Sequence, residues 1–208
     1  MAEEKKSIKL QRLTEKSVKE YTEALASAEG KPENGSACAL VAALAANLGA
    51  LAAQSAAEGA LAPEILEELT AMGTYMLKQV DEIPRSRTPL IRRLSEGSTP
   101  EELESAARVA CGIPNEIVYI MCRNIELLDQ VADACPDSMV YNVLGAVYLS
   151  LAVIAAMRAE IRDVSSHMME FSFRYTVNRE AELNLQNHQE QIDGLMTKLT
   201  ARLEKDNK

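Results

Sequence analysis

Hydrophobic residues recur along this chain with helical spacing. In the segment 14–28, Val18, Tyr21 and Leu25 fall on one stripe at spacings of three and four, which predicts an amphipathic helix. The strongest cluster of helix-breaking residues follows at 30–35, and Ser36 is placed to cap a second helix over 37–58. That second helix is rich in alanine, with small residues every four positions at Ala45, Gly49, Ala53 and Ala57. Such a row lets neighbouring backbones approach closely, so we expect this helix at the centre of a bundle.

The rest of the chain repeats the helical pattern. A third helix is predicted from Pro63 to just before Pro84, then a loop over 84–89 and a short helical piece over 90–94. Thr99 is predicted to cap a helix that reaches about Asp133 and is kinked or split at Pro114. Two further helices are expected over 139–162 and 165–204, the last with a packing seam formed by Ile192, Leu195, Leu199 and Leu203. With no strand-like alternation, the pattern predicts an all-α, orthogonal or up-down bundle of six to seven helices in one domain, 1–208.

Composition narrows the class of protein. The 208 residues are 47% hydrophobic, which argues against disorder, and the net charge of −9 argues against general nucleic-acid binding. The charged N-terminus does not read as a signal peptide, so we expect a cytoplasmic protein. The apolar runs 37–53 and 143–157 fall short of the ~18–20 residues that span a bilayer. Both are interpreted as buried helices, and no membrane partner is expected.

Cysteine and histidine content disfavours metal chemistry. The four cysteines have no C-x-x-C spacing and lie in or beside apolar helical sequence, where a free cysteine behaves as a small hydrophobic residue. The two histidines, His167 and His188, are too few and too far apart to indicate a metal site. We therefore expect no metal ligands.

Two segments are candidates for binding an anion. The turn 31–36 leads into the N-terminus of the alanine-rich helix, where unpaired N–H groups suit an anionic ligand, although an ordinary capped connection has the same appearance. The segment 84–93 carries four arginines and no acid, so it could hold a carboxylate or phosphate. The alternative is that these arginines pair with acidic residues of the protein itself.

Two further groups could take part in catalysis or in lining a cleft. Asp81, followed by Glu82 before the arginine segment, could transfer protons at the rim of a cleft, or could simply be solvated at a helix end. Asp137 in the turn 136–138, with Tyr141 and Asn142 one turn later, could face a cavity. The alternative is that Asp137 or Ser138 caps the next helix and Tyr141 is half-buried packing.

The order of these pieces resembles the formiminotetrahydrofolate cyclodeaminase and methenyltetrahydrofolate cyclohydrolase family over roughly residues 8 to 200. Pro32, Gly35 and Ser36 match a Pro-Gly-Gly-Gly-Ser turn before an alanine-rich helix, whereas Glu33 and Asn34 replace two of its glycines. The stretch 106–117 resembles the family's A-x-x-x-P-x-x-I segment. Asp81 aligns with the Asp of an Asp-x-x-Ala-Phe motif, although Pro84-Arg85 follows it here, and Tyr141-Asn142 stands where the family has Ser-Asp.

The resemblance implies an all-helical homodimer that acts on a tetrahydrofolate derivative without a metal or redox cofactor. It assigns proton transfer to Asp81 and ligand binding to the turn that contains Pro32, Asn34, Gly35 and Ser36. Arg85 and Arg87 would hold the anionic glutamate tail of the folate, and Asp137 would compensate for the missing Ser-Asp pair. Two alternatives stay open: a family descendant that binds another anionic small molecule, and a non-catalytic helical dimer.

Overall fold

The computed structural model describes residues 12–27 and 32–205, and within these ranges all regular structure is helical. The short 3₁₀ helices η1 (Leu13–Glu15) and η2 (Asp137–Met139) accompany seven α-helices. The α-helices are α1 (Val18–Leu25), α2 (Asn34–Gln54), α3 (Pro63–Glu96), α4 (Pro100–Ala134), α5 (Val140–Ser165), α6 (Phe171–Asn187) and α7 (Gln189–Lys205). The predicted all-α fold class and number of helices are thus confirmed.

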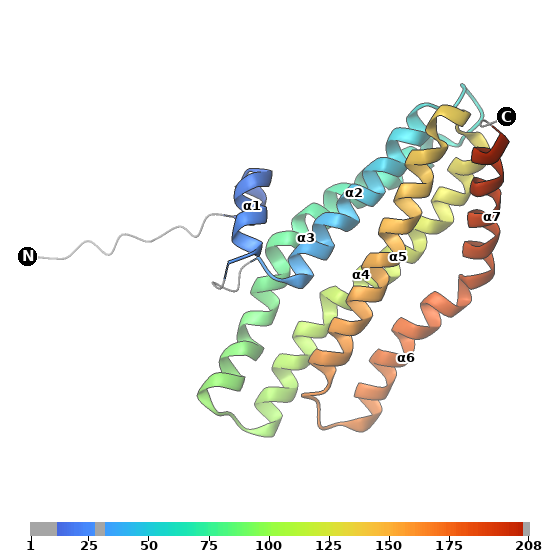
Figure 1. The fold of residues 1–208 in the computed structure, drawn as a ribbon. Helices are drawn as coiled ribbons and strands as arrows, with labels where there is room; N and C mark the ends of the chain where they lie inside the picture. The colour runs from blue at the N-terminus through green and yellow to red at the C-terminus, as the bar shows by residue number, and fades with distance from the viewer. Residues whose placement is uncertain (1–11, 28–31, 206–208) are drawn as a thin grey trace, which may run out of the picture.

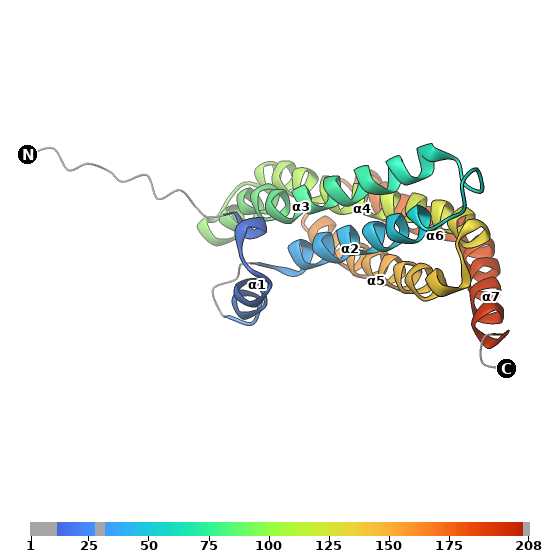
Figure 2. The same ribbon diagram turned by 90° about the horizontal axis from the view of Figure 1, so that it is seen from above.

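The four long helices α2 to α5 lie side by side and alternate in direction, while α6 and α7 follow one another along one side of the bundle (Figure 1). Figure 2 shows α1 standing apart from the four long helices, at the end of the molecule opposite α7. Short connections between successive long helices force this up-and-down order.

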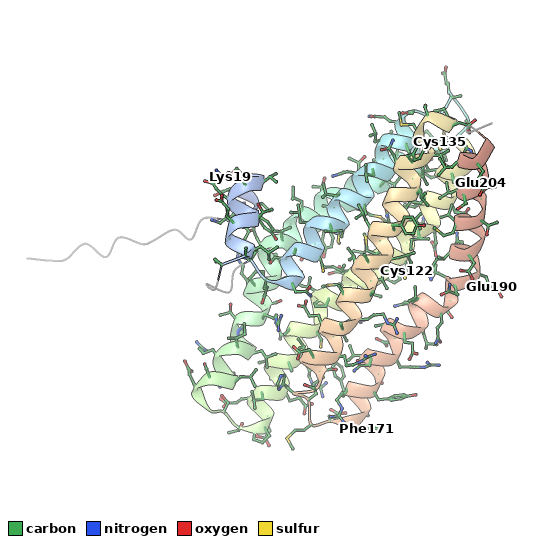
Figure 3. All side chains as sticks on the ribbon, viewed as in Figure 1. Lys19, Cys122, Cys135, Phe171, Glu190 and Glu204 are labelled. Carbon is green, nitrogen blue, oxygen red and sulfur yellow. The ribbon has the colours of Figure 1, made fainter. Side chains whose placement is uncertain are left out.

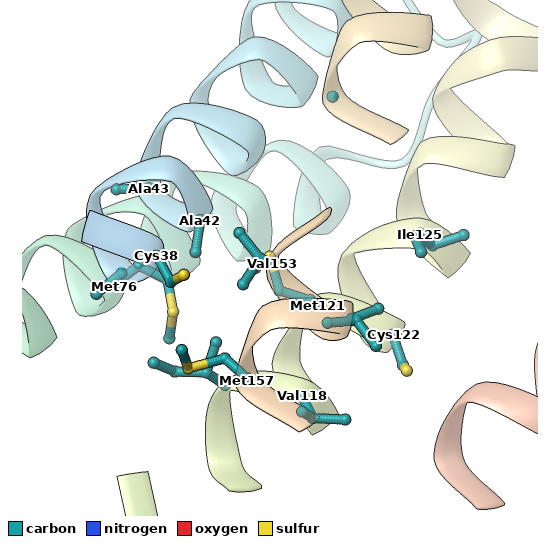
Figure 4. Close-up of a cluster of buried hydrophobic side chains, with 14 of the residues drawn as sticks. Cys38, Ala42, Ala43, Met76, Val118, Met121, Cys122, Ile125, Val153 and Met157 are labelled. Atoms are coloured by element: carbon teal, nitrogen blue, oxygen red, sulfur yellow. The ribbon is translucent and has the colours of Figure 1, made fainter. Parts of the chain in front are cut away.

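The alanine-rich α2 packs against α3, α4 and α5, as its small-residue row predicted. Ala45, Gly49 and Ala53 are buried, and a Cβ at Gly49 would lie only 2.7 Å from Leu128 Cδ2 on α4. Ala57, the fourth member of the predicted row, lies beyond the end of α2 and is exposed. Figure 4 shows part of the core beside α2, where Cys38 and Ala42 lie near Met76, Val153 and Met157. The helix ends at Gln54, so the prediction that it reaches Glu58 was wrong at that end.

Helix starts were predicted with mixed success. Thr99 forms the predicted capping box, in which its hydroxyl accepts the N–H of Glu102 and the Glu102 carboxylate accepts the N–H of Thr99. Helix α1 is shorter than predicted, since Ser17 caps it and it ends at Leu25; residue 28 lies outside the described residues. Ser36 does not cap α2, because that helix begins at Asn34, after the extended residue Glu33.

The proline-rich segment 84–89 is helical, so the predicted loop and the short separate helix after it were wrong. Helix α3 continues through Pro84 and Pro89, and Ile83 and Leu90 are both buried on its core face. Proline removes an N–H donor at residues 84 and 89. Thr88 Oγ1 also donates to the carbonyl of Pro84 over 2.6 Å, a bond that does not replace the missing donors. Helix α4 likewise continues through Pro114. Packing of the helix on both sides of each proline outweighs the local breaking signal.

The predicted last helix is two helices that meet at His188, and the first of them begins at Phe171 rather than near Ser165. The His188 ring bridges Asn184 O, 2.6 Å from Nδ1, and Glu126 Oε1 on α4, 2.7 Å from Nε2. Ile192, Leu195 and Leu199 are buried and Leu203 is partly buried. The C-terminal stripe is therefore a packing seam against the chain's own bundle, as predicted.

Two segments are long and apolar enough to cross a membrane by length and composition, contrary to the expectation that both were too short. These are Asn34–Gln54 and Asp137–Ser165. Half of the most apolar window in the first segment, and 39% of that in the second, are buried inside the bundle. The two helices pack against each other and against α4, so burial accounts for part of their apolar character.

Candidate functional site

Polar side chains from three helices converge at the N-terminus of α2. Asn34 Nδ2, on α2, donates to Glu160 Oε2, on α5, over 2.8 Å. Arg87 Nη1, on α3, lies 3.5 Å from Glu160 Oε1. The side chain of Glu160 is only 3% exposed, so its carboxylate is buried among these partners.

Arg87 is surrounded by carboxylates. Besides Glu160, its guanidinium lies 3.4 Å from Glu33 Oε2 and 3.6 Å from Asp163 Oδ2. One positive and three negative charges give this cluster a net charge of −2. An anionic ligand would therefore have to displace a carboxylate of the protein from Arg87.

Gly35 lets the Glu160 carboxylate approach the first turn of α2. A Cβ on Gly35 would lie 2.8 Å from Glu160 Oε1 and 2.6 Å from Ile83 Cγ2, closer than atoms can pack. The helix N-terminus carries partial positive charge and unpaired N–H groups, which stabilise a carboxylate placed there. The protein's own Glu160 thus supplies negative charge at the end of α2 where the sequence predicted an external anion.

The other residues of the predicted turn take less direct parts. Pro32 is buried, and residue 31 lies outside the described residues. Ser36 is fully buried in the first turn of α2, and among the described residues its hydroxyl oxygen has no hydrogen-bond partner. Asn34 is the member of the predicted turn whose side chain contacts the charged cluster.

Asp81 lies on a different face of α3. Its Oδ1 accepts the N–H of Leu13 and its Oδ2 accepts the hydroxyl of Thr14, both over 2.6 Å, so it anchors η1 to α3. It also lines an open pocket of about 310 Å³ together with Arg12, Thr14, Lys78, Glu82 and Arg85. Six residues separate Asp81 from Arg87, which turns the two side chains about 120° apart around the helix axis.

The arginines of the segment 84–93 pair with acidic side chains of the protein itself, which was the alternative to binding an external anion. Arg85 Nη1 lies 2.7 Å from Glu82 Oε1, Arg92 pairs with Glu96, and Arg93 pairs with Glu102 at the start of α4. They lie on a helix rather than in a loop. Only Arg87 of this group reaches the cluster around Glu160.

The predicted residues Asp137, Tyr141 and Asn142 lie at the other end of α5. Asp137 pairs with Arg202 of α7, Tyr141 is 62% exposed, and Asn142 Nδ2 contacts Met139 Sδ. Eighteen residues of helix separate Asn142 from Glu160, a rise of about 27 Å. The structure therefore does not bring these three residues to either Asp81 or Arg87.

Sequence reasoning missed Glu160. It follows the apolar run 143–157, so an acid shortly after a buried stretch was the available signal. Its partner Asn34 is 126 residues away, and no local pattern connects them.

Cysteines and tyrosine near the cluster are held in their neutral forms by burial. Burial raises the pKa of the Cys38 thiol to about 11 and that of Tyr21 to about 12. All four cysteines are buried and free, as predicted. No group of three or more metal-ligating side chains occurs among the described residues.

This all-α architecture is that of a known enzyme fold. The structure matches the crystal structure of formiminotetrahydrofolate cyclodeaminase from Thermotoga maritima with a TM-score of 0.74, covering 95% of this chain and all of that chain. The two sequences are 18% identical. No protein-family model matches the sequence, and no curated protein is significantly similar to it. The chain therefore has the cyclodeaminase fold predicted from its motifs.

Proposed function

We propose that this protein is an enzyme of folate one-carbon metabolism, either a cyclodeaminase or a cyclohydrolase that acts on a tetrahydrofolate derivative. One observation carries the proposal: the fold matches that of formiminotetrahydrofolate cyclodeaminase along nearly the whole chain. The turn that first suggested this family also lies beside buried polar groups of α3 and α5.

The proposed chemistry is a proton-transfer reaction. In the cyclodeaminase reaction, the N10 amine of a 5-formimino-folate attacks the formimino carbon, N10 loses a proton, and the leaving nitrogen gains protons and departs as ammonia. The cyclohydrolase reaction instead adds water to the methenyl bridge. Both reactions need a side chain that accepts and donates a proton near the one-carbon unit.

Two carboxylates could serve, and they differ in accessibility. Asp81 lines an open pocket, whereas Glu160 is enclosed by Asn34 and Arg87. We assign proton transfer to Asp81. Each of its carboxylate oxygens accepts one hydrogen bond from η1 and has a second lone pair that can accept a bond from another proton donor. Glu160 then positions Asn34 and Arg87. Arg85 lines the same pocket as Asp81 and is the arginine placed to hold a glutamate tail.

The alternative is a descendant that kept the bundle but binds another anionic small molecule or none. The net charge of −2 around Arg87 favours it, because this end of α2 repels the glutamate tail of a folate. We retain it as the second candidate.

A binding measurement separates the two candidates. The melting temperature is measured with and without 5-formyl-tetrahydrofolate. At a ligand concentration of ~100 times the dissociation constant, binding adds about 2.7 kcal/mol to the free energy of unfolding and raises the melting temperature by a few degrees. No shift at millimolar ligand would contradict the folate proposal.

Turnover then tests the assignment of Asp81. Asp81→Asn should abolish turnover, whether methenyl-folate is formed by a cyclodeaminase or consumed by a cyclohydrolase, followed by absorbance, and should leave the melting shift intact. Asp193→Asn, an exposed Asp on α7, is the matched control. Unchanged turnover in Asp81→Asn would remove Asp81 from the mechanism.

We also propose that the protein is a cytoplasmic homodimer, without nucleic-acid or membrane partners, whose interface is the outer face of α2 and α5. Leu44 and Leu51 of α2 and Tyr141 and Tyr148 of α5 are each 46–62% exposed. The seven-residue spacing places each pair on one helix face, and Leu48 of α2 lies 3.9 Å from the Cβ position of Gly145 between them. A second copy placed on this face would cover all four side chains.

A further inference from the structure

An open pocket of about 400 Å³ lies between the last turns of α5 and the first turns of α6. Its volume is within the range of small-molecule sites. Its lining includes four arginines: Arg158 and Arg162 of α5, and Arg174 and Arg179 of α6. Arg158 and Arg162 are one helical turn apart, so both side chains point from the same face of α5.

This pocket is positively charged in an acidic protein. Glu182 is the one acidic residue in the lining, so the ionised lining side chains sum to +3, whereas the whole chain carries −9. The surplus of positive charge is therefore local to this pocket.

Most of these arginines lack an acidic partner. Within residues 12–27 and 32–205, the side chains of Arg158, Arg162 and Arg174 have no carboxylate within 4.0 Å, and only Arg179 is paired, with Glu182. Elsewhere the protein pairs its arginines closely; Arg123, for example, forms two hydrogen bonds to Glu68. Three unpaired guanidinium groups around one cavity form a site for a multiply charged anion.

Two exposed aromatic rings complete the lining. Phe171 and Tyr175 are 66% and 58% exposed, and their rings stack with centroids 6.1 Å apart and an interplanar angle of 24°. Arg174 lies over the Phe171 ring, 5.6 Å from its centroid. Figure 3 shows Phe171 at the first turn of α6, at the end of the molecule opposite Cys135. Flat apolar rings beside cations suit a ligand with a planar ring of its own.

We propose that this pocket binds a phosphate ester that carries a planar ring, the chemistry of a nucleotide. The guanidinium forks of Arg158, Arg162 and Arg174 bind the phosphate oxygens, and Phe171 and Tyr175 stack on the ring. The pocket shares no lining residue with the pocket at Asp81, so the proposal does not depend on the folate activity.

Isothermal titration of the full chain with four probes tests the chemistry: ATP, inorganic triphosphate, adenosine and citrate. We expect triphosphate to bind and ATP to bind at least about fivefold more tightly. Adenosine should not bind at millimolar concentration. Added salt should weaken the binding of both ATP and triphosphate. Citrate binding more tightly than triphosphate would overturn the assignment to phosphate. No binding of either phosphate at millimolar concentration would overturn the site itself.

Variants locate the binding. The double variant Arg162→Gln/Arg174→Gln should weaken ATP binding by tenfold or more. The control double variant Lys19→Gln/Arg92→Gln removes the same charge from α1 and α3, and it should change the affinity for ATP less than twofold. Phe171→Ala should weaken the binding of ATP but leave the affinity for triphosphate unchanged. Circular dichroism establishes that each variant is folded. Equal losses in the two double variants would contradict a specific site and indicate general charge attraction.

Discussion

Gly35 is the position where a single methyl group has the largest expected effect, because Ile83 and Glu160 occupy the space beside its Cα. Gly35→Ala should lower the free energy of unfolding by about 1–3 kcal/mol, since the added Cβ forces the packed core and the buried carboxylate apart. Urea denaturation measures the change.

A second glycine serves as the matched control for this prediction. Gly112 lies inside α4, and nothing comes within 4 Å of a Cβ built there. Gly112→Ala should raise stability by about 0.4–1 kcal/mol, because alanine restricts the unfolded chain and favours the helix. If both substitutions were stabilising, the close packing of Glu160 against Gly35 of α2 would be contradicted.

At the residue scale the sequence predicted part of the candidate site. Asn34 was selected from the position of its turn before a helix and Arg87 from its arginine-rich segment, both with the family resemblance, and the structure places both against Glu160. Glu160 itself was missed, because its significance depends on a partner 126 residues away. The contact between Asn34 and Glu160 is a tertiary one, and local spacing carries no information about it.

Among the elements, α3 and α4 are joined by a hydrogen-bonded ion pair whose strength depends on pH. Arg123 donates to both oxygens of Glu68, over 2.8 and 2.9 Å, and these bonds hold the pKa of Glu68 below its ordinary value of 4.5. A lowered native pKa means that the unfolded chain binds this proton first as the pH falls. The pair therefore stabilises the fold fully above pH 4.5, and the contribution is lost as the pH falls through the native pKa.

Glu68→Gln isolates that contribution. The pair is partly exposed, so we expect the wild-type protein to be more stable than the variant by about 0.2–1 kcal/mol at about pH 7. The difference should shrink as the pH falls below 4.5 and through the lowered native pKa of Glu68, because the carboxyl is then protonated in both states. Melting temperatures of both proteins across this range measure it. A difference that stays constant with pH would contradict the role of the charge.

Element boundaries show where the local sequence signals fail. Thr99 was predicted correctly as a helix start, because its capping box is local. The break at Pro84 was predicted wrongly, because burial of Ile83 and Leu90 on the core face holds the helix together through the prolines. The break at His188 was missed, because the ring contacts Glu126 on another helix. Local chemistry sets the ends of helices only where tertiary packing does not oppose it.

At the scale of the whole molecule, the exposed face of α2 and α5 predicts association between copies. We expect the protein to sediment with the mass of two chains at micromolar concentration and Tyr148→Glu to sediment as one chain, because a buried unpaired charge at the interface is costly. Tyr119→Glu is the matched control, since Tyr119 is 63% exposed on α4, away from this face. A monomeric wild type, or dissociation in both variants, would contradict the proposed interface.

The attachment of η1 through Asp81 has a consequence for how different parts of the molecule fluctuate. Tyr21 is the one buried residue of α1, and η1 is held by two hydrogen bonds to a single carboxylate. A segment with so few buried contacts opens at a lower free energy than the four long helices. Amide protons of α1 will therefore exchange with solvent through local opening, whereas those of α2 will exchange only through global unfolding. An opening that includes η1 also releases Asp81, so the same carboxylate alternates between a structural bond and a free acceptor.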